Sequence, residues 1–318
     1  MNAPPDHDTA GKRARSGVSP RAGYLFVALA AVLWAASGTA AKFLFNGGMD
    51  PFQLVQLRTT LAWVAMVAWL ALRRSPFPRI AGRDWFYFAG LGVLGIAGAQ
   101  FFYLFAISQI KVAAAILLHY LGPVFIALYA VVFARQHLGR MTLAAIATAL
   151  IGCALVVEAN HLDMLAMNRA GVIGGLCAAL AFATYSVMGE YGMRRYDPWT
   201  VLCYAFLFAA AACNVIHPPL TALFQSYTAA QWGCILYIAV AGTVLPFGFY
   251  FEGINRIRST HASITATLEP ITAAAISWLA LDETLAPLQI VGGVLVIAAV
   301  VLLQTRRGGN GGAKGACR

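Results

Sequence analysis

Charged residues are scarce in this sequence. Only 11% of the 318 residues are Asp, Glu, Lys or Arg, whereas 60% are hydrophobic. Because a soluble domain carries about a quarter charged residues, this composition excludes an ordinary soluble protein. Runs of about 20 apolar residues recur along the chain, and each is long enough to cross a bilayer as a helix. The sequence therefore predicts an all-α integral membrane protein surrounded by lipid.

Cysteine patterns and catalytic motifs are also lacking. No two of the six cysteines have C-x-x-C spacing, so they indicate neither a disulfide framework nor a metal site. The sequence contains no Walker loop, no H-E-x-x-H and no G-x-S-x-G. Gly90 to Gly95 has the letters of a dinucleotide fingerprint, but it lies inside an apolar segment, where small residues favour close helix packing. We expect no catalytic residue, no metal and no cofactor, so transport would have to run on gradients.

The apolar segments number ten, and two polar tails flank them. We expect the tails, residues 1–21 and 305–318, to be disordered because they are rich in Gly, Arg or Pro. The expected spans lie near residues 24–45, 51–72, 85–107, 112–133, 141–158, 170–190, 198–217, 232–252, 260–281 and 286–304.

The basic residues provide a test of this count. With the amino terminus in the cytoplasm, 18 Lys and Arg residues fall in cytoplasmic segments and only two, Lys111 and Arg169, in external loops. This asymmetry is what the positive-inside rule demands. It predicts a multi-pass protein of the bacterial inner membrane with both termini in the cytoplasm. The net charge of +10 then reflects residues that face anionic headgroups and needs no nucleic-acid partner.

The two halves of the chain repeat each other at an offset of 147 residues. Asp50-Pro51 falls on Asp197-Pro198, and Phe102-Tyr103 falls on Phe249-Tyr250. The Leu-x-Pro that begins at Leu121 falls on the one that begins at Leu268. Each half, 22–158 and 170–304, holds five expected helices. Because five is odd, the second half is predicted to be inverted relative to the first, with a substrate site at their interface near the membrane midplane.

This pattern resembles the EamA-type transporters of the drug/metabolite transporter superfamily. The resemblance covers residues 24–304 and rests on "FFYLFAISQIKVAAAILLHYLGPVFIALYAVVF", on "YFEGINRIRSTHASITATLEPITAAAISWLALDETLAPLQIVGGVLVIAAVVLL" and on Arg58 in "QLRTTLAW". The first half departs from the family where "ARQHLGR" places Gln136 at a typically acidic position. The resemblance implies ten helices, a cavity walled by the first, third, fourth, sixth, eighth and ninth of them, and transport of small metabolites, often the export of amino acids.

Glu269 is the principal candidate for a functional side chain. It lies about nine residues into its expected helix, roughly 13 Å deep, where a charge costs about 2.5–3.5 kcal/mol on insertion scales. Its repeat partner is Gly122, so the acid departs from the symmetry of the halves. Two interpretations stay open: recognition of a substrate ammonium group or proton coupling, and a structural hydrogen bond beside Pro270.

The other candidates each have a functional and a structural interpretation. Arg58 is suited to a substrate carboxylate, or to a structural ion pair or snorkelling. His119 is either a titratable cavity residue or a packing residue. The remaining candidates line the cavity or pack within the core: Tyr103, Tyr120, Tyr250, Trp34 and Ser37.

Three prolines are expected to bend helices. Pro123, Pro246 and Pro270 each remove a backbone donor and so free the carbonyl four residues earlier. The freed carbonyls either line the cavity or are by-products of bends that serve packing.

The sequence thus predicts a secondary transporter that moves an amino acid or related zwitterion by exchange or proton coupling. The resemblance favours outward transport. A sugar-phosphate or nucleotide-sugar exchanger is the alternative within the same class, although it would require several cationic cavity residues. A membrane-embedded enzyme and a channel are further alternatives. The sequence leaves the substrate, the coupling ion and the oligomeric state open.

Overall fold

The structure is a computed structural model. It describes residues 20–73, 77–110, 112–136, 138–156, 168–216, 222, 225–281 and 286–309. Within these ranges every regular element is a helix and none is a strand. The predicted tails therefore fall mostly outside the described residues, while the last helix continues to Gly309, past the predicted span end at residue 304.

The helices of the first half, in chain order, are α2 (Pro20–Asn46), α3 (Pro51–Leu72), η1 (Gly82–Asp84), α4 (Trp85–Gly90), η2 (Leu91–Ala97), α5 (Gly98–Gln109), α6 (Val112–His119), α7 (Gly122–Val132) and α8 (Arg140–Val156). Those of the second half are α9 (Arg169–Gly192), α10 (Pro198–Ile216), α11 (Ala229–Ala239), η5 (Val240–Val244), α12 (Leu245–Ile257), α13 (Ser259–Ala266), α14 (Leu268–Leu281) and α15 (Pro287–Gly309).

The offset found in the sequence recurs in the helix boundaries. A shift of 147 residues carries the first residues of α3, α5, α6 and α8 onto the first residues of α10, α12, α13 and α15. It also carries η2, a π-helical segment, onto a stretch that contains η5, the π-helical segment of the second half. The same local sequence signals therefore form the same local structure twice.

Two of these repeated signals have clear physical causes. Asp50 caps α3, because its Oδ1 accepts hydrogen bonds from the backbone nitrogens of Phe52 at 2.8 Å and Gln53 at 3.3 Å. Asp197 caps α10 in the same manner. In each case the next residue is a proline at the first helical position, where its missing N–H costs nothing.

The Leu-x-Pro motif marks a break in a membrane segment in both halves. The first segment divides into α6 and α7 just before Pro123, and the second divides into α13 and α14 at Thr267, just before Pro270. Proline cannot donate to the preceding turn and crowds it, so each segment restarts as a new helix at the motif.

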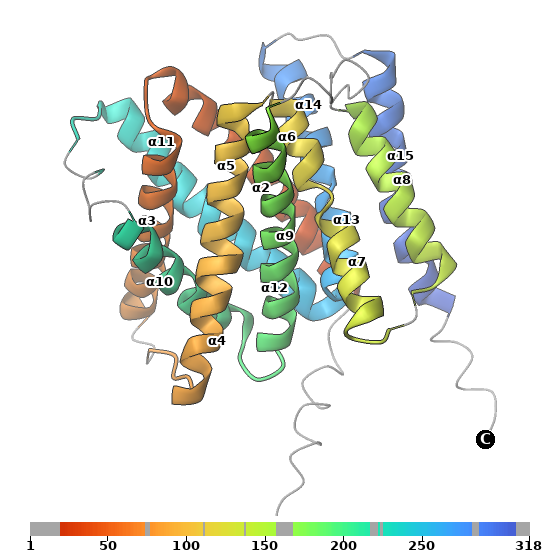
Figure 1. Cartoon of the computed structure of the whole chain (residues 1–318), viewed down its shortest axis with the longest axis horizontal. Helices are drawn as coiled ribbons and strands as arrows, with labels where there is room; N and C mark the ends of the chain where they lie inside the picture. Colours follow the sequence, from red (N-terminus) through yellow and green to blue (C-terminus); the bar gives the residue numbers. More distant parts are fainter. Residues whose placement is uncertain are drawn as a thin grey trace, which may run out of the picture.

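The halves pack against each other rather than side by side as separate domains. The first helix of each half lies against the third segment of the other, so that α2 contacts α12 and α9 contacts α5. In Figure 1, α3, α10 and α11 lie at one edge of the bundle and α8 and α15 pair at the other. Each of these contacts between the halves therefore has an equivalent in which the two halves have changed roles.

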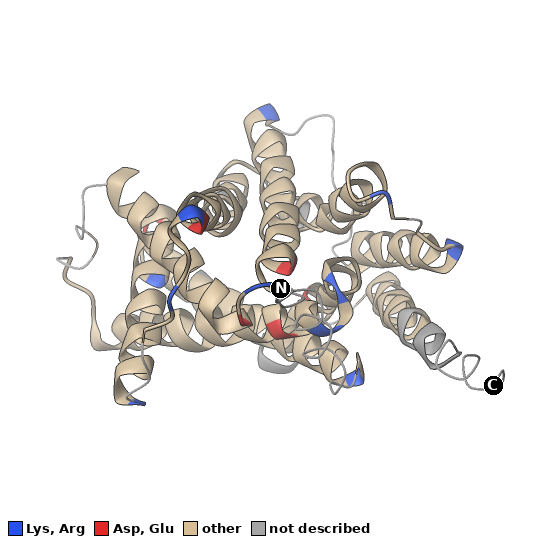
Figure 2. Ribbon diagram, turned by 90° about the horizontal axis from the view of Figure 1, so that it is seen from below, with Lys and Arg blue, Asp and Glu red and all other residues tan. Residues whose placement is uncertain are grey.

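Membrane-spanning capacity follows the helix lengths. Among the described residues, seven helical stretches are long and apolar enough to cross a membrane, while Arg140–Val156 and Pro287–Leu302 are apolar but shorter. The segment around Thr267 is divided into two short helices. The predicted count of ten spans, and the inversion of the second half, stay predictions. Viewed end-on in Figure 2, the few charged positions lie mostly at helix ends and connections.

Candidate functional site

Glu269 and Tyr120 meet where the two broken segments face each other. Glu269 lies in the first turn of α14, and Tyr120 lies between α6 and α7. The Tyr120 hydroxyl oxygen is 2.7 Å from Oε2 of Glu269 and 3.2 Å from the carbonyl oxygen of Ala266. Among the described residues, no donor reaches the other carboxylate oxygen, Oε1, and Glu269 is only half-buried. One oxygen is thus held and the other is available.

Arg58, on α3, lies within electrostatic range of this carboxylate. Its Nε donates to Oγ1 of Thr243 at 3.1 Å, and its Nη2 donates to the carbonyl oxygen of Gly242 at 3.2 Å. The charges of Arg58 and Glu269 interact, yet within the described ranges Arg58 has no carboxylate within 4.0 Å. An arginine has five N–H donors, so most of the fork stays available.

Tyr103 and His119 lie beside Tyr120 and the two charged side chains. Their ring centroids are 5.1 Å apart, and the His119 ring also lies 5.7 Å from that of Tyr120 and 5.2 Å from that of Phe182. Tyr103 lies within electrostatic range of Arg58 and Glu269. Nδ1 of His119 is buried and has no hydrogen-bond partner in the part of the chain that the structure describes. A buried polar atom without a partner is rare in proteins.

Two of the three predicted carbonyls accept side-chain hydrogen bonds. The carbonyl four residues before Pro246 is that of Gly242, which accepts from Arg58. The carbonyl four residues before Pro270 is that of Ala266, which accepts from Tyr120. These two prolines therefore bear directly on how the side chains around Glu269 are held. Pro123 lies at the start of α7, next to the break that positions Tyr120.

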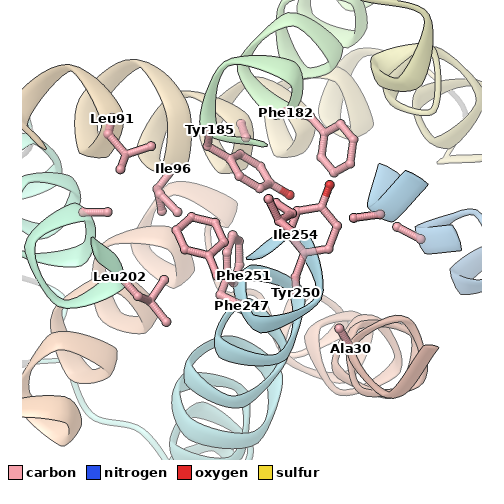
Figure 3. Packing of buried hydrophobic residues seen from close by; sticks show 14 of the residues in the cluster. Ala30, Leu91, Ile96, Phe182, Tyr185, Leu202, Phe247, Tyr250, Phe251 and Ile254 are labelled. Atoms are coloured by element: carbon pink, nitrogen blue, oxygen red, sulfur yellow. The ribbon is translucent and has the colours of Figure 1, made fainter. Parts of the chain in front are cut away.

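Trp34, Ser37 and Tyr250 are tightly packed next to this group. Ser37 lies against Gly242, whose carbonyl oxygen accepts from Arg58, and Phe182 separates Tyr250 from His119. Trp34 packs against Phe247 and Tyr250, with ring centroids 5.3 Å and 5.4 Å apart. The hydroxyl of Tyr250 is 3.0 Å from Oγ of Ser186, and Figure 3 shows its ring among other aromatic side chains of the core. Ser37 lies so close to Gly242 that a Cβ there would approach its Oγ to 2.3 Å.

Sequence analysis missed Thr243, which anchors Arg58, and Ser186, which pairs with Tyr250. Like Glu269, Thr243 is a polar residue whose repeat partner is not polar, because that partner is Ile96. The repeat partner of Arg58 is Ala205 and that of His119 is Ala266. Polar residues whose repeat partner is apolar thus gather at this site, and a systematic search for them would have found Thr243.

The site is suited to binding a zwitterion, which carries one positive and one negative charge. It places one carboxylate and one guanidinium within electrostatic range, with hydroxyl and imidazole groups beside them, and leaves donors and an acceptor free. Among the described residues, no group of three or more His, Cys, Asp or Glu side chains is placed to hold a metal ion.

The model of the EamA-like transporter family matches residues 21–158 and again 169–305. The chain is 28% identical over 291 residues to an uncharacterized inner membrane transporter, YicL, of Salmonella typhimurium, covering 90% of this chain and 96% of that protein. It is 26% identical over 281 residues to a probable terminal-alkyne amino-acid exporter of Streptantibioticus cattleyicolor, covering 87% and 92%. A protein of known crystal structure shares the fold, with a TM-score of 0.75 at 19% identity over 91% of this chain and 99% of that one.

Proposed function

The chain belongs to the EamA-like transporter family, and on that premise we propose that it is a secondary transporter that exports an amino acid or a related small zwitterion across the inner membrane. In this proposal the two halves rock about a site at their interface and expose it to each side in turn. The relative in Streptantibioticus cattleyicolor, a probable amino-acid exporter, supports both the class of cargo and the direction.

One arrangement carries the choice of a zwitterion: Arg58 and Glu269 lie near enough for their charges to affect each other, but they are farther apart than an ion pair. In this proposal the ligand lies between the two side chains and satisfies both charges. The carboxylate of an amino acid fits the free N–H groups of Arg58, which bind such a group bidentately. Its ammonium group fits the free Oε1 of Glu269.

The same carboxylate offers a route to energy coupling. A charge at this depth is retained only when a cation, a hydrogen bond or a proton compensates it. Tyr120 supplies one hydrogen bond to Oε2, which leaves one oxygen to compensate. A proton carried by Glu269 when no ammonium group is bound would couple export of the substrate to proton movement in the opposite direction.

The proposal is tested by metabolite profiling of spent medium and cell extract from a bacterial host. Cells that contain the intact chain should accumulate one class of amino acid or zwitterion outside, relative to cells with an empty vector. Glu269→Gln, at equal membrane abundance, should reduce this export at least tenfold, because a hydrogen bond to a charged group contributes about 1.5–3 kcal/mol. Arg58→Lys should retain part of the activity, since lysine keeps the charge but not the fork.

Glu252→Gln serves as the matched control. Glu252 is also half-buried and lies in a membrane segment, but it pairs with Arg256 one turn away on α12. Its loss should leave export unchanged. Export that survives Glu269→Gln in full would contradict the proposed site. A phosphate-bearing cargo would show another pattern, in which Arg58→Gln abolishes transport and Glu269→Gln does not.

A further inference from the structure

A cavity lies behind the segment that holds Arg58. Its volume is about 590 Å³, within the range of small-molecule sites, and its lining is largely apolar. α3 contributes Ala65, Met66 and Trp69, α10 contributes Trp199, and the η5–α12 segment contributes Val240 and Leu245. None of the residues that surround Glu269 lines it.

The cavity opens sideways onto the apolar surface of the bundle. Trp69 is 49% exposed, Val240 is 42% exposed and Leu245 is 37% exposed, although each lines the cavity. Because this surface faces lipid in the proposed orientation, the molecules that meet the opening are acyl chains. An empty apolar cavity of this size open to lipid would forfeit dispersion contacts on every wall.

One basic side chain, that of Arg73, lies at one end of the cavity. Arg73 follows α3, and its guanidinium lies 5.1 Å from the centre of the Trp69 ring. Pro78 and Asp197 also line this end. The carboxylate of Asp197 accepts hydrogen bonds from the first turn of α10, from the backbone nitrogens of Trp199 and Thr200, each at 3.1 Å. Its two oxygens are therefore already hydrogen-bonded within the first turn of α10, while the carboxylate keeps its negative charge.

Asp84, the acidic residue that follows Arg73 in the segment after α3, also has partners of its own. Asp84 accepts a hydrogen bond from Tyr196 at 2.7 Å and pairs with Arg195 at 3.5 Å. Arg73 forms no ion pair within the described ranges and is exposed at the helix end. A tryptophan with an arginine above it, at the mouth of an apolar cavity, combines an acyl-chain surface with a positive charge at headgroup level.

We propose that this cavity binds the acyl chain of an anionic phospholipid of the cytoplasmic leaflet, with the headgroup phosphate against Arg73. The cavity and Arg58 share one wall, because Val240 and Val244 face the cavity while Gly242 and Thr243 hold the guanidinium. A bound chain therefore supports the π-helical segment η5 from behind. The proposal rests on the proposed function only for the orientation of the helices in the membrane.

Quenching of tryptophan fluorescence by brominated lipid tests the site directly, since Trp69 and Trp199 form its walls. The purified full chain in detergent is titrated with phosphatidylglycerol and, separately, with phosphatidylcholine, each with the same brominated acyl chains. Half-maximal quenching by phosphatidylglycerol should need about fivefold less lipid, the effect expected of one basic residue at an anionic surface. Arg73→Gln should remove this preference. Ala65→Phe, which fills the cavity, should reduce the depth of quenching by both lipids.

Two matched variants separate the cavity from the general surface. Arg140→Gln removes an exposed arginine from the predicted cytoplasmic side, and Ala212→Phe changes the repeat partner of Ala65, which does not line the cavity. Both should behave as the intact chain does. Equal quenching by the two lipids, or a loss of preference in Arg140→Gln as large as in Arg73→Gln, would overturn the proposal. If Ala65→Phe does not elute as a folded species, Arg73→Gln at the exposed helix end decides.

Because this experiment measures no transport, its failure leaves the roles of Glu269 and Arg58 untouched. Conversely, a chain that exports no amino acid can still show the preference for phosphatidylglycerol.

Discussion

At the residue scale, Tyr103 and Tyr250 show how equivalent positions acquire different chemistry. They occupy the same place in the two halves. The hydroxyl of Tyr250 is bonded to Ser186, whose Oγ also donates to the carbonyl oxygen of Phe182 at 2.8 Å. The hydroxyl of Tyr103 has no hydrogen-bond partner among the described residues and lies in the field of Arg58 and Glu269. We therefore expect Tyr250 to contribute to stability and Tyr103 to contribute to substrate binding.

This difference yields a paired prediction. Tyr250→Phe should lower the free energy of unfolding by about 1 kcal/mol, the net contribution of a neutral hydrogen bond, and leave the substrate concentration for half-maximal transport unchanged. Tyr103→Phe should leave thermal stability unchanged and raise that concentration about fivefold, since one hydrogen bond to the substrate is lost. Thermal unfolding in detergent and transport by reconstituted vesicles measure the two quantities. Identical behaviour of the two variants would show that the repeat, and not the local partners, decides their roles.

At the element scale, proline and π-helical segments place backbone carbonyls where side chains can use them. η5 ends one residue before α12 begins with Leu245 and Pro246. Pro246 has no N–H to offer Gly242, whose carbonyl oxygen accepts from Arg58 instead. π-helical segments recur at functional sites in helices, and here the segment also contributes Thr243 to the anchor of Arg58. The irregularity of the helix and the position of the guanidinium thus have one cause.

Pro246→Ala tests this link. Alanine restores the missing donor, so the carbonyl of Gly242 gains a backbone partner that competes with Arg58. We expect transport to fall several-fold while thermal stability holds or increases, because alanine is the better helix former. Pro287→Ala is the control, since Pro287 is the first residue of α15, where a missing N–H costs nothing. Unchanged transport in Pro246→Ala would show that the missing N–H of Pro246 does not determine how Arg58 is held.

At the scale of the whole molecule, the arrangement in the membrane follows from charge. The basic residues place both ends of the chain in the cytoplasm if ten segments cross the bilayer. The contacts between halves persist when the halves are exchanged, as expected of two similar units related by a pseudo-twofold axis. If each half crosses the membrane five times, as predicted, the two units enter the membrane from opposite sides.

Reporter fusions measure this arrangement. Alkaline phosphatase should be active when joined after Gln109, Asn168 or Gln225, which lie in external loops of the predicted topology. It should be inactive after Arg83, Arg194 or Arg258, which lie in predicted cytoplasmic segments. Green fluorescent protein at the same positions should show the reverse pattern. Activity on both sides of one predicted span would mean that the segment does not cross.

The sequence by itself determined the all-helical membrane class, the family and the 147-residue repeat. Apolar runs, basic residues and capping motifs such as Asp50-Pro51 act locally, through lipid solvation and through backbone donors next to them in the chain. It also indicated Glu269 and Arg58, because a charged residue in an apolar segment is costly wherever the segment lies. Bends at Pro123 and Pro270 were expected from the missing N–H alone, whereas the structure divides each segment into two helices there.

Only the tertiary structure decided which of these residues meet. Tyr120 reaches Glu269 across a sequence separation of 149 residues, and Arg58 reaches Thr243 across 185. Contacts of this kind depend on how helices of the two halves cross, and the chain's periodicity does not encode that locally. Tyr250 could not be told from Tyr103 until Ser186 was seen beside it. The lateral cavity was equally hidden, because it forms where α3, α10 and α12 fail to fill the space between them.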